Sequence, residues 1–352
     1  MQRKRSLEDD LVGRLKGIGL TSTDVAKVTE IFGELDVQIK RQSRLNCQRS
    51  LLRLFDELAQ NICLNVDGEV FEWETLSPQL LLTHMLDNSP FLHKSYAAAI
   101  AARPPSRDAP WHLILVFDEF VPGNKLAVDN RRKELTIAYN FAELGLQVLE
   151  KSASWLVPAV LRHTVLATCD GGCSNCLRLM LRQLLFEGPQ GFEHGYPINV
   201  GGAIVVIFAE LFVVLSDSDG IRMALDWRGY NSLRPCFRCD SVFKIGSDLA
   251  SRAGGVEIDS TDHDAFGQRT SADLFRDFDI VLDAAQRYSD NLLTKTKFEK
   301  VVKAVGFNPN PLGLLADLDL RDRIDWVQVV CHDWMHGYLS DGTLVQEVLL
   351  LV

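Results

Sequence analysis

The sequence lacks any apolar run long enough to cross a membrane. The longest, from residue 203 to residue 215, contains Glu210 and is shorter than the roughly 18 residues that a spanning helix needs. The first residues, MQRKRSLEDDL, begin basic but have no apolar stretch behind them, so we expect no secretory signal. Eight cysteines in a long chain of this kind are expected to be reduced thiols of the nucleus or cytosol rather than a disulfide framework.

The chain also lacks an excess of positive charge. It has 37 Lys and Arg against 47 Asp and Glu, a formal net charge of −10 over 352 residues. This balance excludes a uniformly basic protein that coats nucleic acid, but it is compatible with a local basic groove. Because 47% of the residues are hydrophobic, the composition excludes a mostly disordered chain, and the length allows one to three domains.

The N-terminal region is predicted to be helical, because apolar residues recur at three- and four-residue spacing up to about residue 65. Residues 66–108 are expected to be irregular, with a short apolar helix near residues 80–86 and a linker-like AARPPSRD segment at their end. We therefore predict a helical N-terminal region with a linker over 1–105 and a second domain over 106–352. Four arginines of the first region form either a basic helix face for DNA or an ordinary solvated face: Arg41, Arg44, Arg49 and Arg53.

From residue 111 onward the pattern is that of a mixed α/β sheet. The run WHLILVF is continuous enough to be a strand buried on both faces. A crossover helix is predicted after three strands, then another strand, and later a group of helices, which indicates a sheet interrupted by a helical insertion at about 228–325. The expected strands are 111–117, 135–141, 155–161 and 203–215, and the expected helices are 173–187, 219–227, 272–293 and 297–305.

Acidic residues follow two of the apolar strands. Asp118, with Glu119, comes directly after one strand, and Asp217, with Asp219 two residues later, comes after another. Carboxylates at the ends of neighbouring strands can hold two Mg²⁺ or Mn²⁺ ions, which would activate the attacking oxygen and stabilise the leaving oxygen of a phosphodiester. The alternatives are an ordinary acidic turn for Asp118 and a helix N-cap for Asp217.

Thiols and histidines suggest a zinc site in the insertion. The CxxC pair Cys236 and Cys239 supplies two of the four ligands that structural zinc needs, and the candidates for completing it are His332 and His336. Asp333, between these histidines, is either a metal ligand or partner of one, or the cap of a final helix. A second cysteine group is better explained by buried free thiols: Cys169, Cys173 and Cys176.

Four phrases in a fixed order complete the pattern: LILVFDEFVPGN, an apolar strand ending in LSDSD, PCFRC, and HDWMHGYLSDGTL. Together they resemble the transposase of CACTA-type (En/Spm, Tnp2-like) DNA transposons, including transposon-derived proteins of dinoflagellates. The resemblance covers about residues 110–352. In that family a phrase "DFPA" precedes a "CP.C" pair by some 18 residues, and here Asp217 lies 19 residues before Cys236.

The resemblance implies an RNase H-like catalytic core that cleaves DNA and transfers strands at a metal-dependent acidic site. Carried over by position, Asp118 is the first acid, Asp217 the second with Asp219 as the substitute, and Asp333 the candidate third. The family's Glu after "MH" is replaced here by Gly337. The implied partners are DNA carrying transposon ends and a further copy of the chain, with no membrane.

Family members continue well beyond the position of Val352, so we expect a C-terminally truncated product of a transposable element. Three further interpretations remain open. The chain is either a domesticated, non-catalytic module that binds DNA or protein, an inert transposon fragment, or an unrelated zinc-binding α/β protein. Binding that depends on salt but not on Mg²⁺ is expected only of the non-catalytic module.

Overall fold

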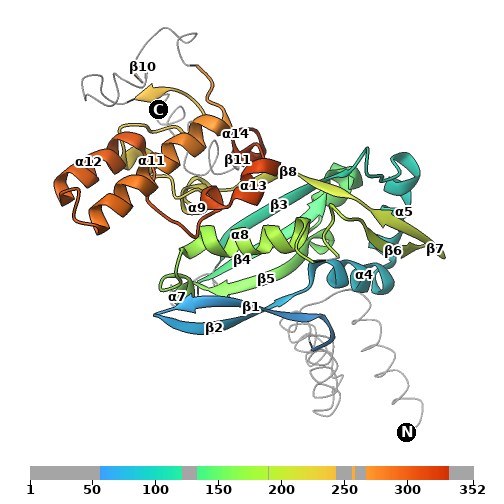
Figure 1. The fold of residues 1–352 in the computed structure, drawn as a ribbon. Helices are drawn as coiled ribbons and strands as arrows, with labels where there is room; N and C mark the ends of the chain where they lie inside the picture. Colours follow the sequence, from blue (N-terminus) through green and yellow to red (C-terminus); the bar gives the residue numbers. More distant parts are fainter. Residues whose placement is uncertain (1–55, 121–132, 189, 243–255, 258–266, 333–352) are drawn as a thin grey trace, which may run out of the picture.

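The computed structural model describes residues 56–120, 133–188, 190–242, 256–257 and 267–332 (Figure 1). The strands are β1 (Ala59–Val66), β2 (Glu69–Leu76), β3 (Trp111–Phe120), β4 (Glu134–Phe141), β5 (Leu156–Arg162), β6 (Tyr196–Val200), β7 (Ala203–Ile207), β8 (Ala209–Ser216), β9 (Ser241–Val242), β10 (Val256–Glu257) and β11 (Val330–His332). The α-helices are α4 (Pro78–Asn88), α5 (Pro90–Ala102), α6 (Leu146–Leu149), α7 (His163–Leu166), α8 (Gly172–Leu185), α9 (Ser218–Ala224), α11 (Ser271–Ser289), α12 (Lys295–Val305), α13 (Leu318–Arg323) and α14 (Trp326–Val329).

Five strands form one mixed sheet in the order β11-β8-β3-β4-β5. β3 pairs antiparallel with β4, and β4 pairs antiparallel with β5. On the other side of β3, β8 is parallel to β3, and β11 is parallel to β8. The chain is therefore a mixed α/β protein, as the sequence predicts, and each strand expected over 111–161 is present.

The apolar run in β3 explains its central place. Neighbours on both sides and helices against the sheet leave little of it exposed: Trp111, Leu113 and Leu115 are completely buried. Burial of large apolar side chains is the main favourable contribution to folding. Exposure begins only at the last residues of the strand, where Asp118 and Phe120 reach the edge of the sheet.

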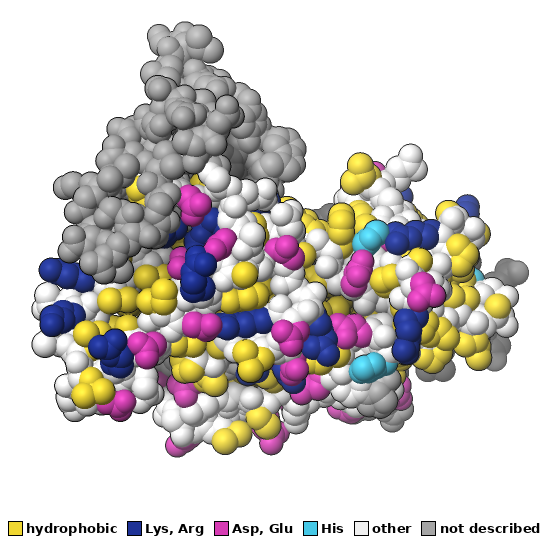
Figure 2. Space-filling view, turned by 45° about the horizontal axis from the view of Figure 1, so that its top comes forward, with side chains coloured by type: hydrophobic (Ala, Val, Ile, Leu, Met, Phe, Trp, Pro, Cys, Tyr) yellow, Lys and Arg dark blue, Asp and Glu magenta, His cyan; other side chains and the backbone are white. Residues whose placement is uncertain are grey.

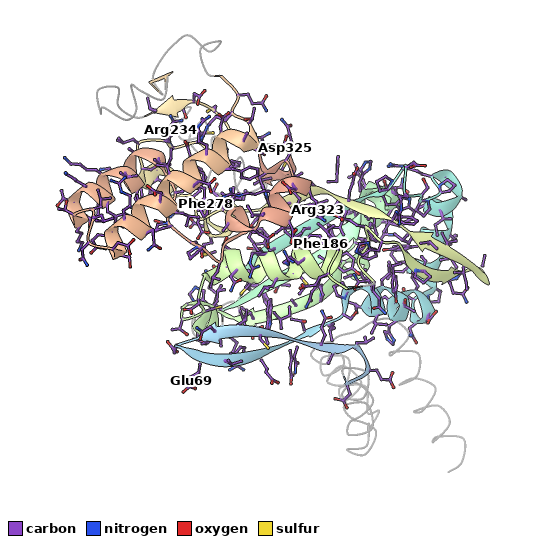
Figure 3. All side chains as sticks on the ribbon, viewed as in Figure 1. Glu69, Phe186, Arg234, Phe278, Arg323 and Asp325 are labelled. Carbon is purple, nitrogen blue, oxygen red and sulfur yellow. The ribbon has the colours of Figure 1, made fainter. Side chains whose placement is uncertain are left out.

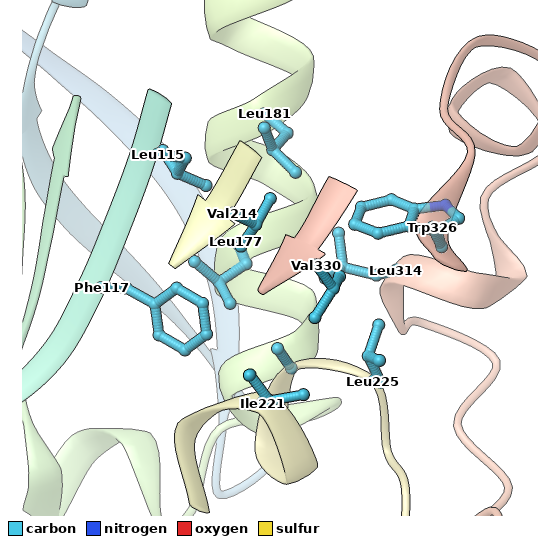
Figure 4. A pocket seen from close by; sticks show the side chains of 11 residues that line it. Leu115, Phe117, Leu177, Leu181, Val214, Ile221, Leu225, Leu314, Trp326 and Val330 are labelled. Carbon is cyan, nitrogen blue, oxygen red and sulfur yellow. The ribbon is translucent and has the colours of Figure 1, made fainter. Parts of the chain in front are cut away.

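Helix α8 crosses one face of the sheet and buries nine of its fourteen residues (Figure 1). It meets β3, β8, β11 and α9 around a small apolar cavity, where Leu177 and Leu181 of α8 face Val214 and Val330 (Figure 4). The helix begins after Gly171, which has a φ of +76°. A Cβ atom there would lie 2.8 Å from the Cβ of Leu312, so only glycine allows the later turn to pack against the start of α8.

The N-terminal part differs from the sequence prediction. Residues 59–76, expected to be helical and then irregular, form the β1–β2 hairpin beside β5 (Figure 1). The short helix expected near residues 80–86 is present as α4, whereas α5 replaces part of the expected irregular stretch. Trp73 of β2 is 2% exposed and donates its indole N–H to the Val160 carbonyl of β5 at 3.0 Å. Residues 58–102 therefore share one hydrophobic core with the sheet.

The helical insertion consists mainly of the antiparallel pair α11 and α12. Tyr288 and Phe298 stack across this pair, with ring centroids 5.1 Å apart. Phe278 on the inner side of α11 packs edge-on against Phe307 at 6.1 Å (Figure 3). The predicted helices over 272–293 and 297–305 are thus confirmed, each with slightly different ends.

Basic and acidic side chains alternate over the face drawn in Figure 2, and many of them form ion pairs. Arg182, for example, contacts Asp317 and Asp319 at 2.9 Å each. Arg323 lies over the ring of Phe186 at 4.4 Å and pairs with Glu193 (Figure 3). In the described part of the chain, no helix is long and apolar enough to span a membrane.

Candidate functional site

The first two predicted acids follow adjacent parallel strands. In the pairing of β3 with β8, Leu115 lies opposite Val214 and Val116 opposite Leu215. Two residues further along, the same register leads to Asp118 and Asp217. Because paired strands are about 4.8 Å apart, their ends bring these two backbones together at one edge of the sheet.

Asp118 and Asp217 line the same small cavity, of about 10 Å³, which is room for one water molecule. Apolar side chains close it from inside, including Phe117 and Leu135. The complete lining comprises Phe117, Asp118, Glu119, Leu135, Ser216, Asp217, Gly220 and Met223. The structure thus places both predicted acids at one cavity, at the ends of two paired strands. Their roles as metal ligands stay predictions.

Asp217 is the N-cap of α9, the alternative that the sequence analysis left open. Its Oδ1 accepts a hydrogen bond from the Gly220 N–H at 2.6 Å. Gly220 is closely surrounded, because a Cβ there would lie 2.0 Å from Ser216 Oγ and 3.1 Å from Asp217 Oδ1. The cap therefore fixes the carboxylate beside the cavity and uses only one of its two oxygens in the described structure.

The cavity also contains Glu119, which the sequence analysis names only as the neighbour of Asp118, and Ser216, which it does not name. Glu119 forms ion pairs with Lys133, the residue before β4, and with His163, whose Nε2 lies 3.4 Å from Glu119 Oε1. Its backbone N–H donates to Asp118 Oδ1 at 2.7 Å. Ser216 is 4% exposed. The only sequence signal for these two residues is their position beside Asp118 and Asp217.

Two buried oxygens at this cavity have no hydrogen-bond partner among the described residues: Glu119 Oε1, whose contact with His163 lies outside hydrogen-bond geometry, and Ser216 Oγ. A buried polar atom without a partner costs about 1–3 kcal/mol, so such atoms usually bind a water molecule or a ligand. The cavity thus presents carboxylate and hydroxyl oxygens, which are the donors preferred by Mg²⁺ and Mn²⁺.

The structure does not bring Asp219 into this cavity. Its side chain is 75% exposed and pairs with Arg222 Nη1 at 2.5 Å, on the outer side of α9. His332 lies opposite Ser216 in the pairing of β11 with β8, and its side chain is outside the description. The predicted residues Asp333 and His336 lie outside the described residues, as do the four N-terminal arginines.

The predicted zinc ligands Cys236 and Cys239 lie in a turn that is tied to the start of α11. The Arg238 N–H donates to Cys236 Sγ at 3.3 Å. The backbones of Cys239 and Gln268 form an isolated antiparallel β-bridge. Hydrogen bonding with the Cys236 thiol, and to a lesser extent with Ser241, lowers the pKa of Cys239, against the opposing effect of burial. A thiolate is the form that binds metal, although no third described side chain completes the site.

The cysteine group at the start of α8 agrees with its structural interpretation. Cys169, Cys173 and Cys176 are free and buried. Burial raises the pKa of the Cys173 thiol, with a smaller contribution from the nearby carboxylate Glu119. The Cys173 thiol is therefore uncharged and packs like a small apolar side chain. A hydrogen bond with Cys176 lowers the pKa of Cys169, against the opposing effect of burial.

Throughout the described residues, no group of three or more His, Cys, Asp or Glu side chains is arranged to hold a metal ion. Asp118 and Asp217 thus form a pair of candidate ligands. Comparison with known proteins finds neither a matching family model nor a matching curated protein sequence.

Proposed function

We propose that this chain is a transposase-like DNA nuclease and strand transferase with a two-metal acidic site. The observation that carries the proposal is the cavity at the ends of β3 and β8, which Asp118 and Asp217 line together. Two carboxylates from separate strands, held on rigid backbone, are what a pair of divalent cations on a phosphodiester requires. The CACTA-like order of phrases along the sequence supports the same proposal.

The strand arrangement supports an RNase H-like fold as part of this proposal. Such a sheet has three antiparallel strands followed by two strands on the other side of the first and parallel to it. The order β5-β4-β3-β8-β11 and the strand directions agree with this arrangement. The helix α8 between β5 and β8, and a helical insertion after β8, are also consistent with it.

In this proposal Asp118 and Asp217 hold Mg²⁺ or Mn²⁺, and the third acid, Asp333, comes from outside the described residues. Asp217 Oδ1 receives the Gly220 N–H, so its Oδ2 is the oxygen available to a cation. Cations bound there would lower the pKa of the attacking water or DNA 3′-hydroxyl and stabilise the leaving oxygen. The chain itself fixes the two carboxylates, through strand pairing for Asp118 and through the N-cap for Asp217.

Cleavage of DNA tests the proposal directly. We expect the full-length chain to nick supercoiled plasmid, or DNA with the transposon ends, in the presence of Mg²⁺ or Mn²⁺ and not with EDTA. Asp118→Asn should lower the nicking rate by at least about 100-fold, the scale for losing one stabilising group of a transition state. Asp108→Asn is the matched control, because Asp108 is exposed ahead of β3. Equal nicking by Asp118→Asn and the wild type would reject the assignment.

A non-catalytic DNA-binding module is the second candidate. It is favoured by the use of Asp217 as an N-cap, and by the finding that no three acidic, histidine or cysteine side chains of the described residues are arranged to hold a metal ion. This candidate predicts DNA binding that weakens with salt and is unchanged by EDTA, with no nicking by the wild type.

A further inference from the structure

The segment that leads from the second acid into the insertion is basic. Residues 222–238 contain four arginines and one aspartate, a formal charge of +3, in a chain of net charge −10. Two of these arginines pair with aspartates just outside the segment: Arg222 with Asp219 at 2.5 Å, and the buried Arg234 with Asp240 at 3.4 Å. Arg228 and Arg238 make no ion pair with any described residue. This local excess of positive charge suits an anionic partner.

An arginine and an exposed tyrosine stack within this segment. The Arg222 guanidinium lies over the ring of Tyr230, 5.2 Å from its centroid. Tyr230 is 70% exposed, which is unusual for a large aromatic side chain. A tyrosine ring that rests on a guanidinium and is open to solvent on its other side is a platform on which a nucleic-acid base can stack.

Gly229 holds the two side chains together. Its φ of +56° belongs to the left-handed region that favours glycine. A Cβ at this position would lie 3.0 Å from Arg222 Cδ and 3.3 Å from Arg222 Nε. The close approach of the Gly229 backbone therefore fixes the Arg222 side chain beside Tyr230.

Three buried N–H groups in the same short segment have no acceptor among the described residues: Arg222 Nε, Trp227 Nε1 and Arg228 Nε. Trp227 is 9% exposed, so water does not readily satisfy its indole N–H. Donors left without acceptors are unfavourable, and a group with several acceptor oxygens, such as a phosphate, relieves that cost with a small side-chain movement.

We propose that Arg222, Arg228 and Tyr230 hold a single-stranded nucleotide next to the phosphodiester that is cleaved, the base on Tyr230 and the phosphate on the arginines. This inference rests on the proposed function. Arg222 lies five residues after Asp217, about 8 Å along α9, and its neighbour Met223 lines the acidic cavity. A strand with one phosphate at that cavity therefore has its flanking nucleotide at Arg222 and Tyr230.

Binding of a fluorescent single-stranded oligonucleotide, measured by anisotropy in EDTA, separates this inference from catalysis. We expect Tyr230→Ala to weaken binding about tenfold, the typical effect of losing one base–aromatic stack, and Tyr230→Phe to bind like the wild type. Arg222→Gln should reduce the slope of log K against log salt by about 0.7, the value for one phosphate contact on a single strand.

The matched control for Arg222 is Arg276→Gln, which removes another helical arginine with an Asp partner three residues earlier. Tyr288→Ala is the control for Tyr230, because it removes an exposed tyrosine of the helical pair. Both controls should bind like the wild type, and circular dichroism checks that every variant is folded.

Unchanged binding by Tyr230→Ala, or no binding by the wild type, would overturn the inference. Competition by a mononucleotide at the same concentration as the oligonucleotide would do so as well, since it indicates a free-nucleotide site. If the wild type nicks DNA and Tyr230→Ala binds the oligonucleotide normally, the proposed function is supported and this inference is rejected. Tyr230-dependent binding without nicking by the wild type supports the inference and rejects the nuclease.

Discussion

Asp226 follows α9 in a left-handed backbone conformation, with a φ of 53°. Both of its carboxylate oxygens accept hydrogen bonds from Asn310 Nδ2, at 3.0 and 2.9 Å. Burial raises the pKa of Asp226 to about 7, although hydrogen bonds from Asn310 and Ser174 act in the opposite direction. The side chain of Asp226 therefore joins the end of α9 to the turn that follows α12. Folding favours its protonated form.

The sign of the resulting pH dependence follows from this raised pKa. A carboxyl group whose pKa is raised on folding stabilises the protein fully below its unfolded pKa, and this contribution is lost as pH rises through about 7. We expect Asp226→Asn to remove the effect, so that the free energy of unfolding of the variant relative to the wild type increases by up to about 4 kcal/mol between about pH 4 and about pH 8.

Urea unfolding at the two pH values measures this difference. Asp322→Asn, which removes an exposed carboxylate of α13, is the control and should show the same difference from the wild type at both pH values. A difference between Asp226→Asn and the wild type that does not change with pH would contradict the prediction.

Helix α9 is short, and its first residues combine a structural and a proposed chemical role in Asp217. Two variants distinguish the structural role from the chemical one. Asn is as good an N-cap as Asp, whereas Ala at an N-cap lowers the free energy of unfolding by about 1 kcal/mol. We expect Asp217→Asn to keep the wild-type free energy of unfolding within about 0.5 kcal/mol and to lose metal-dependent nicking. Asp217→Ala should lose both nicking and about 1 kcal/mol of stability.

Nicking assays and urea unfolding of both variants give the comparison. Wild-type nicking by Asp217→Asn would mean that this residue is only a helix cap.

The elements that the sequence predicts best are those with an unambiguous apolar pattern. β3 is a continuous apolar run, and α8 has apolar residues at helical spacing on one side. The β1–β2 hairpin was missed although its turn has a sequence signal. Asp67 and Gly68 both have positive φ, at 54° and 83°, and Asp-Gly between strands is a common signature of such a turn. The helical spacing assigned to the preceding residues concealed that signal.

At the scale of the whole molecule, the local sequence pattern indicates that two acids follow two strands, whereas the expectation that these strands are neighbours needs the folded structure to test it. β8 pairs with β3 although about ninety residues separate them, and this pairing depends on packing across the entire sheet. The roles of Glu119 and Ser216 at the cavity likewise arise from packing, because their unpartnered oxygens are defined by what surrounds them. Local patterns contain no information of that kind.

The sequence suggests a domain division at residue 105, but the elements before that residue contribute side chains to the same core as the sheet. Leu82, Leu92 and Tyr96 of α4 and α5 are each 1% exposed within the same core as the sheet. Hydrogen bonds cross the suggested boundary, since the Tyr139 hydroxyl donates to the Pro78 carbonyl at 2.5 Å and the Trp111 indole donates to the Arg103 carbonyl at 2.9 Å.

Two shortened chains test the boundary. We expect residues 56–352 to unfold cooperatively in urea, because all described contacts of β1, β2, α4 and α5 are retained. Residues 106–352 should lack a cooperative transition and bind the dye ANS, because losing α4 and α5 exposes the apolar face they cover and leaves Trp111 and Tyr139 without their acceptors. Cooperative unfolding of residues 106–352 at the midpoint of the full chain would instead identify residue 105 as a true domain boundary.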